Sequence, residues 1–173
     1  MPHYTYAFQG NEAAASKTAR AVGRSLPAST KQSVEICAMI RGKPLAYARR
    51  LLEDAKNFKR PLAFKRFVNG YGHKSGMGPG RYAPTTATLI LATIANASKN
   101  AQVKNLGDDL IIIHACAHHA SHSYRYGRQS RRKEKRTHVE IVLAPRAEAK
   151  LARSNNTVKK PKPKVVNTAE KTQ

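Results

Sequence analysis

Apolar residues recur at the three- and four-residue spacing of an amphipathic helix in two neighbouring stretches. Ser29 and Gln32 form the S-x-x-Q pattern of a capping box at the start of the first, and Gly42 suits its end. Pro44 suits the first turn of the second helix. The apolar positions are Val34, Cys37 and Ile40, then Leu45, Ala48, Leu51, Leu52 and Ala55.

A third helix is predicted from Pro84 to about Val103, and Asn105 and Gly107 are expected to stop it. Its buried face is predicted to carry Leu89, Ile90, Ile94, Ala97 and Ala101. This helix follows a glycine-rich stretch, so we expect a long loop between the second and third helices.

Three further stretches favour strands. Residues 17–26 alternate in polarity, residues 110–117 form a buried apolar run, and residues 138–144 place Val139, Ile141 and Leu143 on one face. The polar stretch between the last two strands is too long for a tight turn. We therefore predict two antiparallel strands that continue outward as a long β-hairpin over residues 118–137.

Net charge is the most informative feature of the composition. The 173 residues carry 32 Lys and Arg against 10 Asp and Glu, a formal net charge of +22. A field of this size usually indicates a polyanionic partner, most often nucleic acid. No run of 18 apolar residues exists, and the N-terminus lacks the pattern of a signal peptide, so neither a membrane role nor secretion is expected.

The positive charge lies in three segments outside the predicted core. The glycine-rich loop, residues 58–82, lies in a window from Ala55 to Gly107 that has nine Lys or Arg and no acid. The hairpin opposes one acid, Glu134, with seven cations. Those cations are Arg125, Arg128, Arg131, Arg132, Lys133, Lys135 and Arg136. The tail, residues 145–173, contains KKPKPK and is typical of a disordered extension.

Within the glycine-rich loop, Lys65, Arg66, Lys74 and Arg81 can pair with phosphates. Its four aromatics either stack on unpaired bases or pack beneath the loop; they are Phe64, Phe67, Tyr71 and Tyr82. The alternative is a solvated surface loop. Because like charges repel, we expect the loop, hairpin and tail to become ordered only when RNA binds them.

Metal binding and catalysis are not supported. His114, Cys116 and His118 share one face of a strand, but no second ligand pair completes a tetrahedral zinc site. Cys37 and Cys116 are interpreted as reduced, buried hydrophobes. No frame for a nucleophile or a carboxylate pair is recognisable, so no enzyme and no cofactor are expected.

One alternative is a DNA-binding module. Residues 29–55 could form a helix-turn-helix, with Gly42 in the turn and Arg49 and Arg50 near the groove. It predicts duplex binding that depends mainly on those two arginines. A second alternative, an enzyme acting on RNA, would need a catalytic role for His114 or His118.

Several collinear blocks carry a resemblance to a known family. They are STKQSVEICAMIRGKPLAYARRLLED, PLAFKRFVNGYGHKSG, GRYAPTTATLILATIANASKNA and LGDDLIIIHACAH, followed by Gly127-Arg128, nine residues, and His138-Val-x-Ile-x-Leu. From about residue 17 to residue 144, the chain resembles the universal large-subunit ribosomal protein family numbered twenty-two, in its archaeal or eukaryotic form.

The resemblance implies an α+β domain over residues 17–144, in which three helices pack on a small three-stranded antiparallel sheet. Residues 1–16 would be a leader. The hairpin would reach through ribosomal RNA, and its tip, Tyr126, Gly127 and Arg128, would line the nascent-polypeptide exit tunnel.

The same resemblance implies a non-enzymatic constituent of the large ribosomal subunit in the cytoplasm, which supports subunit assembly. Its partners would be ribosomal RNA, neighbouring ribosomal proteins and the nascent polypeptide, with no homo-oligomer. His73 joins the basic loop residues as an RNA contact. Two departures concern the tunnel: residues 118–126 are several residues shorter than is usual, and Tyr124-Arg125-Tyr126 replaces Arg-Ala-x.

Overall fold

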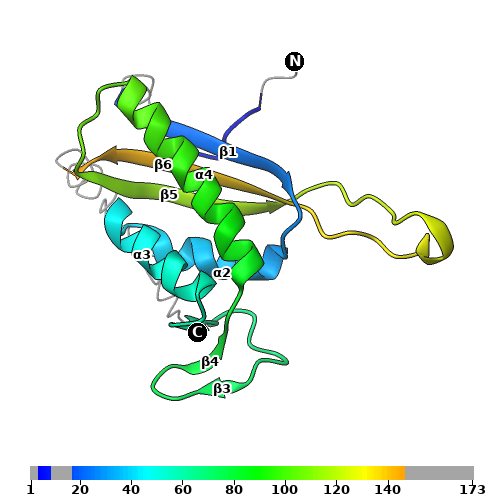
Figure 1. Ribbon diagram of the computed structural model, residues 1–173. Helices are drawn as coiled ribbons and strands as arrows, with labels where there is room; N and C mark the ends of the chain where they lie inside the picture. Colours follow the sequence, from blue (N-terminus) through cyan, green and yellow to red (C-terminus); the bar gives the residue numbers. More distant parts are fainter. Residues whose placement is uncertain (1–3, 9–16, 147–173) are drawn as a thin grey trace, which may run out of the picture.

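The computed structural model describes residues 4–8 and 17–146 of the chain. Its central element is an antiparallel sheet in the order β1-β6-β5, with bounds Ala19–Leu26, Thr137–Pro145 and Leu110–His119. The middle strand, β6, pairs along both edges (Figure 1). All three predicted strands are therefore confirmed, with small shifts of their ends.

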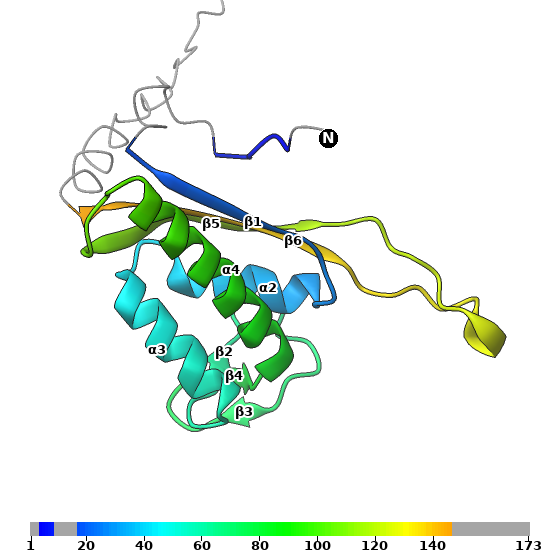
Figure 2. The ribbon, with the colours of Figure 1, turned by 45° about the horizontal axis from the view of Figure 1, so that its top comes forward.

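Three α-helices of the described residues lie on one face of this sheet (Figures 1 and 2). They are α2 (Thr30–Ile40), α3 (Leu45–Lys56) and α4 (Pro84–Val103). The predicted α+β class, with three helices on a three-stranded antiparallel sheet, is confirmed. None of these helices is long and apolar enough to cross a membrane.

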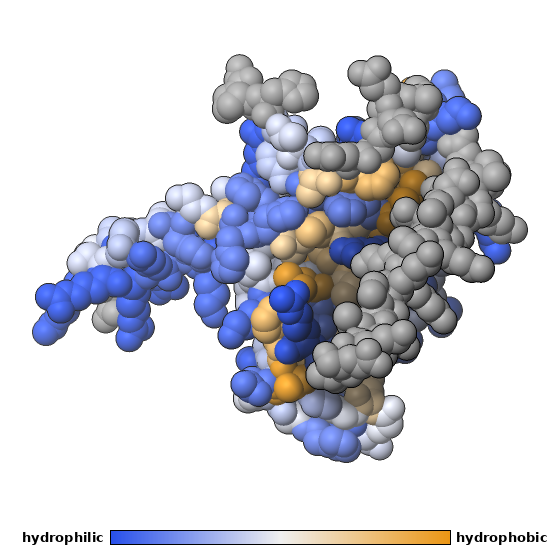
Figure 3. All heavy atoms as spheres, turned by 180° about the vertical axis from the view of Figure 1, so that it is seen from behind, coloured by the Kyte–Doolittle hydropathy of each residue, from blue (hydrophilic) through white to orange (hydrophobic). Residues whose placement is uncertain are grey.

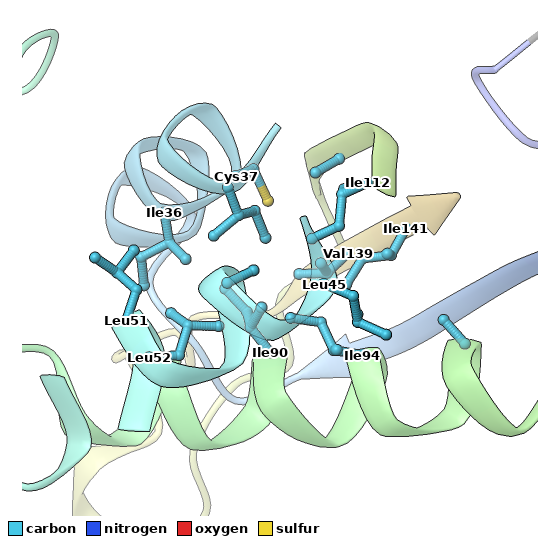
Figure 4. Close-up of a cluster of buried hydrophobic side chains, with 14 of the residues drawn as sticks. Ile36, Cys37, Leu45, Leu51, Leu52, Ile90, Ile94, Ile112, Val139 and Ile141 are labelled. Carbon is cyan, nitrogen blue, oxygen red and sulfur yellow. The ribbon is translucent and has the colours of Figure 1, made fainter. Parts of the chain in front are cut away.

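The core lies between the helices and the sheet (Figure 4). All five predicted apolar positions of α3 are buried there. In α4, Ile90, Ile94, Ala97 and Ala101 are buried, whereas Leu89 is only half-buried. From β6, Val139, Ile141 and Leu143 fill the other side. Each buried Ile, Leu or Val contributes roughly 1.5–3 kcal/mol, so this layer stabilises the domain.

The capping-box prediction for α2 is wrong, although the helix begins where predicted. Ser29 occupies the cap position, but its side chain makes no capping hydrogen bond. Gln32 does not reach back to the cap; its Oε1 accepts a hydrogen bond from the hydroxyl of Thr86 at 2.9 Å. Gln32 therefore bonds to a residue of α4 instead of to the cap residue of its own helix.

The cysteine prediction is half confirmed. Cys37 is free and buried in the core, and burial raises the pKa of its thiol to about 12. Cys116 is also free but only half-buried. A register shift in β5 between Ile112 and His114 reverses which alternate residues point into the core, so that Ala115 is buried and Cys116 is not.

The glycine-rich loop contains a second three-stranded antiparallel sheet that sequence analysis missed. Its order is β2-β4-β3, with bounds Leu62–Ala63, Gly78–Arg81 and His73–Lys74. Gly76, in the turn between β3 and β4, and Gly78, the first residue of β4, take positive φ. The protein's own hydrogen bonds thus hold much of the backbone of this loop.

Residues 120–136 project from the end of β5 and β6 as a two-armed loop, here called the projecting loop (Figure 1). Regular pairing of β5 and β6 stops at His119 and Thr137. Beyond it the only bridge among the described residues joins Tyr124 and Lys133. The arms are therefore irregular, and a long regular β-hairpin is not confirmed.

Candidate nucleic-acid interface

Glu35 fastens the glycine-rich loop to the domain. Its carboxylate is 4% exposed, and Oε1 accepts hydrogen bonds from the backbone N–H groups of Arg66 at 2.7 Å and Phe67 at 2.8 Å. A buried carboxylate needs such donors, and hydrogen bonds to a charged group are stronger than neutral ones. The carboxylate binds backbone rather than guanidinium, so the Arg66 side chain stays exposed.

The aromatics of this loop differ in burial: Phe64 is buried, whereas Phe67, Tyr71 and Tyr82 are half-buried. Phe64 is 2% exposed and stacks on Tyr71, with ring centres 4.3 Å apart and an angle of 20° between the planes. Tyr82 lies against Phe58 at 5.5 Å. Of the two alternatives raised for the aromatics, packing beneath the loop holds for Phe64, which is covered on both sides and cannot stack on a base.

The cations of the loop remain available. Lys65, Arg66, His73 and Arg81 are exposed and Lys74 is half-exposed. The cationic groups of Arg66, Lys74 and Arg81 lie 5.3–5.8 Å from the ring centres of Phe67, Tyr82 and Tyr71, respectively. Among the ion pairs of the described residues, none involves these side chains. An aromatic ring holds a cation without neutralising it.

In the projecting loop, a few hydrogen bonds connect the arms. Arg125 N–H donates to the Arg132 carbonyl at 2.9 Å, and Glu134 N–H donates to the Ser123 carbonyl at 2.8 Å. The tip is the short helix η1 (Gly127–Gln129), where Gly127 has positive φ. Tyr126 beside it is 97% exposed. The tip therefore presents an aromatic ring to any partner.

Glu134 neutralises part of the projecting loop. Its carboxylate lies 2.7 Å from Arg136 Nη2 and 3.8 Å from Arg125 Nε. Arg128, Arg131, Arg132, Lys133 and Lys135 are exposed and have no carboxylate partner among the described residues. Seen from behind, this loop is predominantly hydrophilic (Figure 3). It is thus a ribbon with more positive charge than its own acid can balance.

The histidines on one face of β5 lie next to a buried carboxylate of β6. His114 Nε2 and His118 Nε2 lie 3.8 and 3.5 Å from the carboxylate oxygens of Glu140. Residues 4–8 lie on this face, opposite the helices (Figure 2). Among the described residues, no three His, Cys, Asp or Glu side chains are arranged to hold a metal ion.

The helix-turn-helix alternative is not favoured by the packing. The apolar sides of α2 and α3 face the core, and the longest runs of unpaired cations lie on the other two segments. Sequence analysis missed the anchoring role of Glu35. Nothing in the local pattern around Glu35 indicates that it meets a loop about thirty residues further along the chain.

The fold and these surfaces define a small basic α+β protein that presents unpaired cations on protruding segments. The model of the protein family described as ribosomal protein L22p/L17e matches residues 21–144. The chain therefore belongs to the ribosomal protein L22p/L17e family, which is structural and not enzymatic.

Archaeal relatives are similar over most of their length. Large ribosomal subunit protein uL22 of Archaeoglobus fulgidus is 36% identical over 155 residues, which cover 84% of this chain and 99% of the relative. The protein of the same name from Methanosphaera stadtmanae is 37% identical over 148 residues, covering 80% and 95%. That from Thermofilum pendens is 34% identical over 149 residues, covering 82% and 97%.

Proposed function

We propose that this protein is a structural constituent of the large ribosomal subunit in the cytoplasm, where it binds ribosomal RNA and supports subunit assembly. The observation that carries the proposal is the set of exposed, carboxylate-free cations on the glycine-rich loop and the projecting loop. Family membership and relatives named as large-subunit proteins support it.

The RNA contacts are assigned to both surfaces. The glycine-rich loop contributes Lys65, Arg66, His73, Lys74 and Arg81, and the projecting loop contributes Arg125, Arg128, Arg131, Arg132, Lys133, Lys135 and Arg136. Guanidinium groups match phosphate oxygens with two parallel hydrogen bonds, and recognition would rest on the shape of the RNA. Arg136 has the smallest share, because Glu134 already binds it.

The tip would line the nascent-polypeptide exit tunnel through Tyr126, Gly127 and Arg128. The exposure of Tyr126 supports this assignment, since an aromatic ring in water has no stabilising contact of its own. Partners would then be ribosomal RNA, neighbouring ribosomal proteins and the nascent chain, and the protein would not form a homo-oligomer.

Sucrose-gradient fractionation of the native lysate tests the proposal. The protein should sediment with large subunits and remain there after a moderate salt wash. Recovery in free fractions alone would overturn the proposal. Substituting Arg131, Arg132 and Lys133 by Gln should weaken retention, whereas Arg49→Gln with Arg50→Gln should not. The opposite result would place the contact with the subunit on α3 and contradict its assignment to the projecting loop.

A further inference from the structure

A hollow of about 450 Å³ lies where three separate parts of the chain meet. The first turn of α2 contributes Lys31, the glycine-rich loop contributes Arg66 and Arg81, and the returning arm of the projecting loop contributes Lys135. Its volume falls within the roughly 300–1,000 Å³ typical of ligand sites. The tertiary fold thus gathers four cations that sequence reasoning assigned to separate surfaces or did not assign at all.

Among the residues that the structure describes, no carboxylate lines this hollow. Two acids are close in the chain to lining residues, and both bind other groups. Glu35 is buried and binds the backbone of Arg66 and Phe67, and Glu134, next to Lys135, binds Arg136. Four like charges around one hollow repel each other and destabilise the empty arrangement. An anion placed between them reverses the sign of that interaction.

Aromatic rings hold three of the four cations at the wall. Lys31 Nζ and Arg66 Cζ lie 5.8 and 5.3 Å from the ring centre of Phe67, and Arg81 Cζ lies 5.7 Å from that of Tyr71. These contacts limit the motion of the side chains while leaving their charge free for a ligand. The hollow is therefore preorganised for an anion.

Neutral donors complete the lining. Ser29, which makes no side-chain bond to the helix it precedes, and Asn69 both line this space. Phosphodiester oxygens accept from such donors and from guanidinium forks. The room is greater than a single ion needs, which favours a stretch of backbone with more than one phosphate.

We propose that this hollow binds backbone phosphates of an RNA strand, and that Lys31 is one of its phosphate ligands. The proposal rests on the RNA binding inferred above and adds a residue outside both basic loops. Phosphates bound here would contact Arg66 and Lys135 together. They would thereby fix the base of the projecting loop relative to the glycine-rich loop.

The test compares Lys31, in the first turn of α2, with Lys43, which lies just beyond the C-terminal end of that helix. Lys31→Gln removes a lining cation, and Lys43→Gln is the matched control. Lys43 is also exposed, and its Nζ also lies 5.8 Å from an aromatic ring, that of Tyr47, at the opposite end of the helix. Both substitutions leave the core untouched, and thermal unfolding of the full chain checks that both variants fold.

Binding of a short fluorescent single-stranded RNA is measured by anisotropy over a series of salt concentrations. Loss of one phosphate contact lowers the slope of log K against log salt by about 0.7. Lys31→Gln should show that reduction relative to Lys43→Gln. Equal slopes in the two variants would overturn the proposal.

Amide NMR distinguishes RNA from free phosphate. Titrating the RNA into the wild type should shift the amide signals of Lys31 and Gln32. If inorganic pyrophosphate shifts them and the RNA does not, the hollow is a site for free phosphates and the RNA assignment fails. If the wild type sediments with large subunits but the slopes are equal, only this inference fails. Absence from the subunits would defeat the proposed function itself.

Discussion

The hydroxyl of Tyr4 donates a hydrogen bond to Oε1 of Glu140 at 2.5 Å and so joins the N-terminal segment to the central strand. Glu140 is 1% exposed, and its Oε2 accepts a second hydrogen bond from the backbone N–H of Ala7 at 3.0 Å. A carboxylate buried on the helix-free face of the sheet thus has donors from residues 4–8. Burial and this hydrogen bond raise the pKa of Tyr4.

Tyr4→Phe should destabilise the protein because it removes a donor from a buried carboxylate. The expected loss is about 1–3 kcal/mol in the free energy of unfolding, measured by urea denaturation. Tyr6→Phe is the control, since the described residues provide no hydrogen bond to its hydroxyl and its ring lies near Arg20. Equal effects of the two substitutions would show that Glu140 does not hold this segment.

Glu35→Ala should release the glycine-rich loop. Two backbone N–H groups lose their acceptor, which is expected to cost about 2–3 kcal/mol. Hydrogen exchange should show faster exchange of the Arg66 and Phe67 amide protons. Glu35→Gln keeps an acceptor oxygen at the same position and should restore most of the protection. Unchanged exchange in the alanine variant would contradict the anchoring role.

Gly72→Ala and Gly80→Ala should separate RNA contact from folding. A Cβ at Gly72 meets nothing within 4 Å, whereas one at Gly80 comes within 3.1 Å of Lys74 and Met77 and 3.3 Å of the Leu62 carbonyl. We expect Gly80→Ala to lower thermal stability and Gly72→Ala to leave it unchanged.

Gly72→Ala should nevertheless weaken RNA binding, measured by anisotropy, because a methyl group keeps the RNA backbone from approaching the loop closely. Full RNA affinity in a stable Gly72→Ala protein would mean that RNA does not contact this part of the loop.

Stability should fall as the pH drops below about 6.5, the ordinary pKa of histidine. Burial and Arg41 lower the pKa of His114, and His118 adds to this, while Glu140 opposes it. The unfolded chain then binds a proton that the folded chain does not, so acid favours unfolding.

Replacing His114 by Gln should reduce the difference between urea midpoints measured at neutral and mildly acidic pH. The exposed His73 provides the control, and His73→Gln should leave that difference as in the wild type. An unchanged difference in the His114 variant would assign the acid sensitivity to another group.

Replacing residues 121–135 by Asn-Gly should leave a folded domain. These residues lie outside the core, and Ala120 N–H already donates to the Arg136 carbonyl at 3.1 Å, so a two-residue turn can join the strands. The expected result is cooperative thermal unfolding near the wild-type midpoint, with impaired retention on large subunits. Loss of cooperative unfolding would show that the projecting loop supports the fold.

Local patterns predicted the parts of the fold that depend on local geometry. The five apolar positions of α3 are buried because helical spacing alone decides which residues share a face. The ends of α4 match Pro84 and Val103 for a similar reason, since Pro and the residues that adopt positive φ, Asn105 and Gly107, act on the adjacent backbone.

Predictions failed where a distant group competed with a local one. Thr86 takes the acceptor of Gln32 that a capping box would use. The sheet β2-β4-β3 has strands of two to four residues, too short to show a period in the sequence. Ile36, outside the predicted apolar stripe of α2, is fully buried in the core between the helices and the sheet.

The amino-acid sequence by itself determined the helices, the inward face of β6 and the segments that carry positive charge, because these depend on residue type and short-range spacing. Only the tertiary structure decided which acids are used internally, as Glu35 and Glu140 are, and which cations stand together, as Lys31 and Lys135 do. Such pairings join residues far apart in the chain, and the packing of the helices on the sheet sets their distances.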